Sequence, residues 1–213
     1  HGSIRRQRQM CIRDRAKKPF IVWGQGVILG NAEDEFKSFV EKSGIPAAWT
    51  ILGASALPTS HELNVGMVGM HGNYGPNLLT NECDLLVAIG MRFDDRVTGD
   101  PKTYANQAKI IHLDIDPAEI NKNIKVEVPI IGDCKESLKL ITEKIEKRSH
   151  EKWISKFDDL MKIEFDKVIN SDLNPSKKGL TMGESIIAIN EQTNGEAIIC
   201  LLYTSDAADE LSR

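Results

Sequence analysis

The chain has 213 residues, 41% of them hydrophobic and 27% charged, and a formal net charge of −4. This composition is typical of a soluble globular protein and excludes disordered and collagen-like chains. Because the net charge is negative, the chain as a whole offers no positive field to attract nucleic acid. Apolar runs such as residues 85–89 are too short to span a bilayer. Four cysteines in a chain of this length predict no disulfide scaffold. We expect neither a nucleic-acid nor a membrane partner.

The two ends of the chain differ from the rest. Residues 1–15 are rich in arginine and lack an apolar period, as in a basic arm or a transit peptide. However, MCIRD near the front end can be encoded by DNA whose reverse complement, in a shifted frame, reads CLLYT, the run at residues 200–204. DNA that encodes the preceding RRQRQ likewise has a reverse complement that encodes SDAADE, the run at residues 205–210. We therefore interpret residues 1–15 and 200–213 as translated sequencing adapter and leave them out of the fold prediction.

The first expected elements alternate between short apolar strands and a helix. Strands are predicted over residues 20–23 and 45–50. Between them, Asn31 is expected to cap a helix with one apolar face, and Gly44 to end it. A glycine-rich stretch over residues 53–75 then shows little periodicity.

Three later runs have the length and apolar character of strands buried on both faces, namely residues 84–90, 109–116 and 126–131. Asp133 then begins a helix over residues 135–145. Short apolar strands that alternate with amphipathic helices predict an α/β fold with a doubly wound, mostly parallel sheet.

A second region begins near residue 150. One amphipathic helix is predicted over residues 153–168, with its apolar stripe facing a core, followed by a linker over residues 170–179. A helix over residues 181–194 and a strand over residues 196–199 then begin a further domain.

In doubly wound sheets, ligands bind at the carboxyl ends of the strands. Gly24, Gln25 and Gly26 follow the first strand, as a tight turn or as a loop that lets a ligand approach the backbone. They do not complete the G-x-G-x-x-G fingerprint. Arg92 follows a buried strand and suits a pyrophosphate, although its charged neighbours also fit a solvated surface run with internal salt bridges.

Acidic residues end two other strands. Asp114 can accept hydrogen bonds from ribose hydroxyls, and Asp116 can cap the turn that begins at Pro117. Asp133 is explained equally well as a helix cap.

The glycine-rich segment of residues 66–77 is too rich in glycine for a helix and too apolar for a solvated loop. Its backbone can lie over a flat ring, with Met70 and His71 at the ring edge. A lone histidine is more often structural than catalytic. The sequence contains neither a clustered metal-ligand set nor a nucleophile–base pair, and we assign it no catalytic residue and no metal ligand.

Five strings together resemble one family, the large catalytic subunit of acetolactate synthase, a thiamine-diphosphate enzyme. They are GMHG at residues 69–72, ECDLL at 82–86, GMRFDDRVTG at 90–99, IHLDIDPAEI at 111–120 and GD at 132–133. The resemblance implies a Rossmann-like central domain with a six-stranded sheet that binds FAD.

Carried over residue by residue, the resemblance implies flavin contacts at the ends of several strands. The isoalloxazine ring would lie along residues 68–71, with Arg92 toward the diphosphate. Asp95 and Arg96 would line the active-site entrance. The implied cofactor-binding residues are Gly24, Gln25, Gly26, Thr50, Ile51, Val68, Gly69, Met70, His71, Gly90, Met91, Arg92, Phe93, Asp94, Asp114, Ile115, Asp133 and Cys134.

The resemblance also implies an activity for the parent protein. Pyruvate loses CO₂ on thiamine diphosphate, and the remaining unit joins pyruvate or 2-oxobutyrate in branched-chain amino-acid synthesis, leading to isoleucine and valine. FAD is structural in this family, and the residues that bind thiamine diphosphate and Mg²⁺ lie in its other domains. We therefore expect this segment to be inactive alone, and the parent to be a cytoplasmic homo-oligomer with a small regulatory subunit.

The implied domains are a central FAD-binding domain over residues 16–148, a helix and linker over 149–179, and the start of the thiamine-diphosphate domain over 180–199. Two alternatives stay open. One is the middle domain of another thiamine-diphosphate enzyme, such as glyoxylate carboligase or pyruvate oxidase. The other is a stand-alone Rossmann-like module that binds NAD or another nucleotide.

Overall fold

The computed structural model describes residues 15–174 and 179–198, so the predicted adapter runs lie outside the described residues, apart from Arg15. The chain divides into two compact units, His1–Glu164 and Phe165–Arg213.

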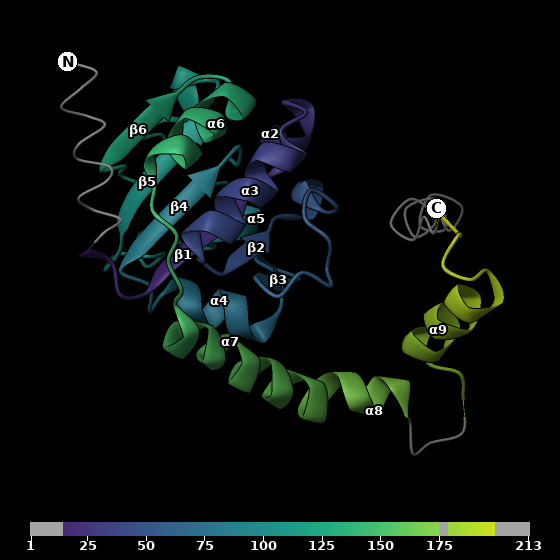
Figure 1. Cartoon of the computed structure of the whole chain (residues 1–213). Helices are drawn as coiled ribbons and strands as arrows, with labels where there is room; N and C mark the ends of the chain where they lie inside the picture. Colours follow the sequence, from purple (N-terminus) through teal and green to yellow (C-terminus); the bar gives the residue numbers. More distant parts are fainter. Residues whose placement is uncertain (1–14, 175–178, 199–213) are drawn as a thin grey trace, which may run out of the picture. The chain divides into compact units, whose positions relative to one another are not determined.

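The first unit contains one six-stranded sheet in which every strand pairs in parallel with its neighbours (Figure 1). Its order is β3-β2-β1-β4-β5-β6. The strands are β1 (Pro19–Trp23), β2 (Ala47–Trp49), β3 (Asn64–Met67), β4 (Leu85–Ile89), β5 (Lys109–Asp114) and β6 (Val128–Ile131). The predicted doubly wound α/β fold is confirmed.

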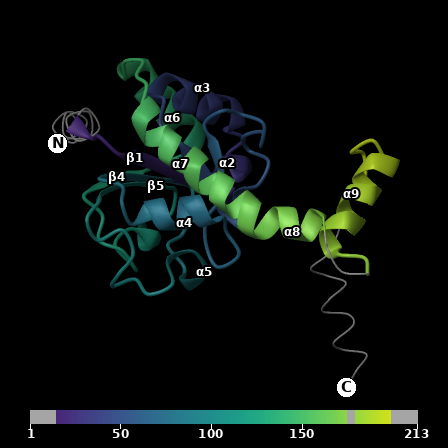
Figure 2. The ribbon, with the colours of Figure 1, turned by 90° about the horizontal axis from the view of Figure 1, so that it is seen from below.

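Helices cover both faces of this sheet, and Figure 2 shows α3 and α6 on one side of the strands and α4 on the other. The α-helices are α2 (Gln25–Leu29), α3 (Glu33–Ser43), α4 (Tyr74–Thr80), α5 (Asp95–Thr98), α6 (Cys134–Lys144) and α7 (Glu151–Glu164). Two short 3₁₀ helices, η1 (Ile51–Gly53) and η2 (Pro117–Glu119), follow β2 and β5.

The core consists of two apolar layers, one on each face of the sheet. Ile21 of β1 packs in the layer that includes Phe36 of α3 and Leu138 of α6. Phe20 packs in the other layer, with Leu79 of α4 and Phe157 of α7. All five residues of β1 are buried, as expected for a central parallel strand covered by helices on both sides.

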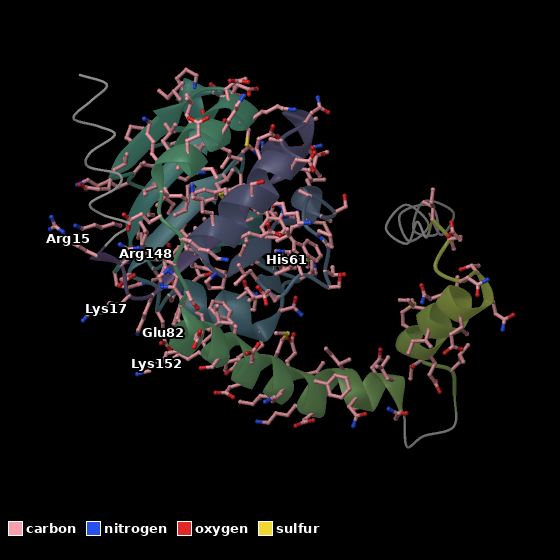
Figure 3. All side chains as sticks on the ribbon, viewed as in Figure 1. Arg15, Lys17, His61, Glu82, Arg148 and Lys152 are labelled. Atoms are coloured by element: carbon pink, nitrogen blue, oxygen red, sulfur yellow. The ribbon has the colours of Figure 1, made fainter. Side chains whose placement is uncertain are left out.

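Helix α7 is anchored to the start of the sheet by Trp153. This side chain is 4% exposed, and its Nε1 donates a 2.8 Å hydrogen bond to the carbonyl oxygen of Pro19. Its ring meets Phe157 edge-on, with 5.2 Å between ring centroids. Nearby, Lys156 Nζ donates to a Glu82 carboxylate oxygen over 2.9 Å, and Glu82 lies near the start of α7 (Figure 3).

The expected helix cap at Asn31 is wrong. Asn31 has a φ of 46° and lies in the turn after α2, a short helix that the sequence did not predict, and Ala32 is the N-cap of α3. Asparagine tolerates this left-handed conformation, which explains its position after Gly30. The first turn of α3 contains Glu33, Asp34 and Glu35, whose negative charges interact favourably with the positive end of the helix dipole.

Strand β3 lies in the glycine-rich stretch for which no element was predicted. It has four residues, its pairing with β2 shifts register, and Gly66 has a φ of 106°, so it lacks the apolar alternation that identifies a strand.

The second unit contains helical segments. Residues Phe165–Ile169 are π-helical, α8 covers Asn170–Leu173, and α9 covers Met182–Gln192, which begins with a capping box of Thr181 and Glu184. The predicted linker is thus helical over its first four residues.

The strand expected over residues 196–199 is absent from 196–198, and residue 199 lies outside the described part. A strand needs a partner, and the described residues of the second unit contain no other strand. No helix in the described ranges has the length and apolar character needed to cross a bilayer.

Replacing Trp153 tests how α7 is anchored. Trp153→Ala removes a buried ring and its hydrogen bond, so the free energy of unfolding should fall by about 3–5 kcal/mol. Lys152→Ala, a neighbouring exposed position on α7 (Figure 3), should change it by less than about 0.5 kcal/mol. Urea unfolding measures both variants, and equal losses would show that Trp153 is no anchor.

Candidate binding site at the carboxyl edge of the sheet

Each group of predicted cofactor-binding residues lies at the carboxyl end of one strand. Because all six strands are parallel, these ends share one edge of the sheet. The groups are Gly24, Gln25 and Gly26 after β1, Thr50 and Ile51 after β2, Val68 to His71 after β3, Gly90 to Asp94 after β4, Asp114 and Ile115 at the end of β5, and Asp133 and Cys134 after β6.

The groups do not converge on one point. The loops after β3 and β6 lie at opposite ends of the edge, since these are the two outer strands. Five spacings of about 4.8 Å put them roughly 24 Å apart along the sheet. A ligand that contacts both ends must therefore be long.

The loops after β1 and β4 touch through glycine backbones. Gly26 N donates to Gly90 O over 2.8 Å, and Gly24 N donates to Ile89 O over 3.0 Å. A Cβ on Gly26 would lie 2.6 Å from Gly90 Cα, and one on Gly24 would lie 2.6 Å from Gly90 O. These glycines are thus needed for packing between the loops, while the Gln25 side chain is exposed. Gly24 is the N-cap of α2, and Gln25 and Gly26 are its first two residues, so β1 leads directly into a helix and not into the tight turn that the sequence allowed.

The turn after β3 is held by an asparagine that we did not assign to the site. Asn77 accepts from Gly69 N and donates to Gly69 O, both over 2.9 Å. Met70 N also donates to Arg96 O over 2.8 Å, which joins this turn to α5. Gly69 has a φ of 110°, and the Met70 side chain is 63% exposed. His71 is also exposed.

Side chains after β4 alternate between the core and the solvent. Met91 and Phe93 are buried, whereas Arg92 and Asp94 point outward. Arg92 Nη2 lies 3.3 Å from Asp94 Oδ2, and Asp94 also accepts from Val97 N at the start of α5. Such an exposed ion pair contributes little energy, so Arg92 can leave it for an anionic ligand.

The predicted entrance residues Asp95 and Arg96 both lie in α5, next to the loop after β4, and both are exposed. Thr50, after β2, is buried, whereas Ile51 is 67% exposed.

Asp114 is the most enclosed acidic residue at this edge, with 9% of its surface exposed. Asp116 N donates to its Oδ1 over 2.9 Å, and His112 Nε2 lies 3.6 Å from its Oδ2. Burial acts to raise the pKa of Asp114, but the neighbouring His112 and the backbone N–H of Asp116 outweigh it, so the pKa is lower than usual. An ionised carboxylate here can accept hydrogen bonds from a hydroxyl-bearing ligand.

The two remaining acidic positions act as caps. Asp116 accepts from Ala118 N over 2.8 Å, and Asp133 accepts from Glu136 N over 3.0 Å at the start of α6. The capping role that the sequence allowed for both is thus present. Cys134 is buried, and burial together with the neighbouring Asp133 raises the pKa of its thiol to about 12.

Exposed apolar side chains also occur in the segments that follow these strands. They are Ile51, Leu52, Met70, Ile115 and Ile131, which end or follow β2, β3, β5 and β6, and Leu29 at the end of α2. Large apolar side chains that are exposed together mark a surface for a ligand or a partner. Within the described ranges, no three His, Cys, Asp or Glu side chains gather to hold a metal ion.

Residues 13–141 match the family described as "Thiamine pyrophosphate enzyme, central domain". The chain belongs to that family. Its central domain includes the whole six-stranded sheet, because β1 begins at Pro19 and β6 ends at Ile131.

Curated relatives narrow the resemblance within the thiamine pyrophosphate enzymes. The chain is 52% identical over 128 residues to "Acetolactate synthase large subunit" of Corynebacterium glutamicum, which covers 60% of the chain and 20% of the relative. It is 39% identical over 179 residues to "Probable acetolactate synthase large subunit" of Methanocaldococcus jannaschii, covering 83% and 30%. For "Acetolactate synthase large subunit" of Lactococcus lactis, the identity is 38% over 186 residues, covering 86% and 31%.

The resemblance to acetolactate synthase large subunits, first drawn from the motifs, is therefore confirmed. The chain spans less than a third of the length of these relatives.

A pair of glycine substitutions tests the contact between the loops after β1 and β4. Gly26 and Gly75 are both the second residue of a helix, but a Cβ on Gly75 meets only ordinary contacts, the nearest at 3.4 Å. Gly26→Ala should lower the free energy of unfolding by about 2 kcal/mol or more. Gly75→Ala should be neutral or stabilising by up to about 1 kcal/mol. Urea unfolding distinguishes them, and a neutral Gly26→Ala would contradict the close contact.

Acid titration tests the environment of Asp114. Because the pKa of the folded carboxyl lies below its ordinary value of 3.8, the ionised form stabilises the fold above that value, and this stability is lost as the pH falls through the folded pKa. Asp114→Asn should therefore give a shallower loss of unfolding free energy between about pH 5 and about pH 3. Urea unfolding across that range measures the slope, and identical slopes would contradict the shift.

Proposed function

We propose that this chain provides the FAD-binding central domain of an acetolactate synthase large subunit. One observation carries the proposal: exposed apolar side chains after β2 and β3, an exposed arginine after β4 and the carboxylate that ends β5 lie along one edge of a parallel sheet. Such an edge suits a long ligand with a flat apolar ring, a charged middle and a ribose, as a flavin dinucleotide has.

The residues present fit such a ligand. Met70 and Ile51 are exposed apolar side chains suited to a flat ring. Arg92 is an exposed cation near the centre of the edge and suits a diphosphate, because guanidinium donates several hydrogen bonds in one plane. Asp114 is a carboxylate suited to a ribose, and the segment of Asp133 and Cys134 after β6 would face the adenine end. When bound, FAD would act as a structural group without a net redox step.

For the parent enzyme, we propose the reaction implied by the relatives. Pyruvate would be decarboxylated, and the remaining unit joined to pyruvate or 2-oxobutyrate, on the route to isoleucine and valine. Thiamine diphosphate and Mg²⁺ would be held by parts of the family outside the matched residues 13–141. We also propose a homo-oligomer with a regulatory subunit, and the domain limits predicted from the sequence.

A cytoplasmic location is part of the proposal. Cys83 and Cys134 are both buried and unbridged, which suits a reducing compartment. The match to the thiamine pyrophosphate family and to acetolactate synthases favours this function over glyoxylate carboligase, pyruvate oxidase or a stand-alone nucleotide-binding module.

Ligand titration of the purified full chain tests the proposal. FAD should bind only weakly, because the chain spans less than a third of the length of its relatives, and NAD should bind at least about tenfold more weakly still. Arg92→Gln should weaken FAD binding about tenfold, because it removes a charged hydrogen-bond donor. Lys109→Gln makes the same charge change at the opposite edge of the sheet, where β5 begins, and should leave affinity unchanged.

Flavin fluorescence and equilibrium dialysis measure these affinities. Equal loss in the two variants, or a preference for NAD, would contradict the proposal. With thiamine diphosphate, Mg²⁺ and pyruvate, the chain alone should form no acetolactate.

A further inference from the structure

His112 is a polar side chain inside an apolar layer, and neither the sequence motifs nor the proposed flavin contacts assign it a role. It lies in β5 and is fully buried. Its ring packs edge-on against Phe93, with 5.0 Å between ring centroids, and Phe93 meets Tyr104 in turn. A buried imidazole in such surroundings is costly unless its N–H finds an acceptor.

The position of its proton follows from its neighbours. His112 Nε2 lies 2.9 Å from the carbonyl oxygen of Met91 and 3.6 Å from Asp114 Oδ2. Both oxygens are acceptors, so Nε2 carries the proton and donates to Met91 O. Nδ1 meets no hydrogen-bond partner among the described residues. The side chain therefore directs its donor toward these two groups.

The two groups belong to different parts of the carboxyl edge. Met91 lies in the loop after β4, directly before Arg92, and Asp114 ends β5. The hydrogen bond from His112 therefore holds the backbone of this loop one residue before Arg92. One buried N–H thus donates to the loop that carries Arg92, and the same nitrogen lies 3.6 Å from the carboxylate of Asp114, near enough to attract it without a hydrogen bond.

We propose that His112 is a positioning residue for this site: its Nε2–H fixes the loop after β4 and the orientation of Asp114, so that Arg92 and Asp114 present a matched pair to the diphosphate and ribose of the ligand. This inference rests on the proposed FAD site. His112 itself is too deeply buried to touch the ligand.

Three substitutions distinguish positioning from packing. In His112→Gln, the side-chain amide nitrogen can reach the place of Nε2, so the donor is restored. In His112→Asn, the amide is too short to reach Met91 O while polarity remains. In His112→Phe, the size and flat shape remain but the donor is lost. A packing role would tolerate Phe best, whereas a positioning role would tolerate Gln best.

Hydrogen–deuterium exchange of the full chain tests the loop without any ligand. The backbone N–H groups of Val97, Thr98 and Gly99 are bonded to Asp94 or Asp95 oxygens at the end of this loop, and Asp116 N is bonded to Asp114. In His112→Phe and His112→Asn, these amides should exchange about tenfold faster. In His112→Gln they should exchange as in the original chain, and amides of α3 should be unchanged in all variants.

FAD titration of the same proteins supplies the second readout. His112→Phe and His112→Asn should bind FAD about tenfold more weakly, and His112→Gln within about threefold of the original chain. If Phe matches the original in exchange and affinity while Gln does not, His112 is a packing residue and the inference is wrong. If the original chain binds no FAD, the proposed function fails, while the exchange data still decide whether His112 fixes the loop.

Discussion

The close approach of two glycine-bearing loops at the centre of the sheet determines the shape of the site. After β1 the chain proceeds to β2 and β3 on one side, and then returns to place β4 on the other side of β1. The strands β1 and β4 are neighbours, but the chain leaves them toward opposite sides of the sheet. Ligands bind where the strand order reverses in this way. Gly24, Gly26 and Gly90 let the two loops contact through their backbones. Any side chain on Gly26 would displace the loop that carries Arg92.

The remaining features of the edge extend outward from this contact. Toward β3, exposed Ile51 and Met70 offer apolar surface beside a turn held by Asn77. Toward β6, Asp114 and Asp133 offer carboxylates, the first kept ionised by its hydrogen bonds. Apolar side chains toward β3, an arginine near the centre, and carboxylates beside exposed Ile115 and Ile131 toward β6 suit the ring, the diphosphate and the ribose–adenine part of a flavin dinucleotide laid along the edge. His112, buried beneath this edge, contacts both the loop that carries Arg92 and the carboxylate of Asp114.

The fold was predictable where burial leaves a simple pattern. The apolar runs of β1, β4 and β5 identify parallel strands covered on both faces, and the strings around Arg92 and Asp114 identify the family and the edge. Strand β3 was not predicted because it contains Gly66 and pairs irregularly with β2, so its sequence lacks the alternation of apolar and polar residues that identifies a strand. His112 and Asn77 were missed because their roles depend on oxygens or backbone groups brought near by folding, which no local periodicity reveals. The one local signal for Asn77 is its position in α4, directly after the glycine-rich turn.

In the proposed complex, one extended ligand, FAD, lies along the whole carboxyl edge of the sheet. Chemical-shift mapping by NMR on the full chain tests this arrangement most directly. We predict that FAD shifts the backbone signals after all six strands, including Gly26, Met70, Arg92 and Asp133, and leaves those of Lys18 and Lys109 at the opposite edge unchanged. Shifts confined to the opposite edge, or no shifts at saturating FAD, would contradict the account.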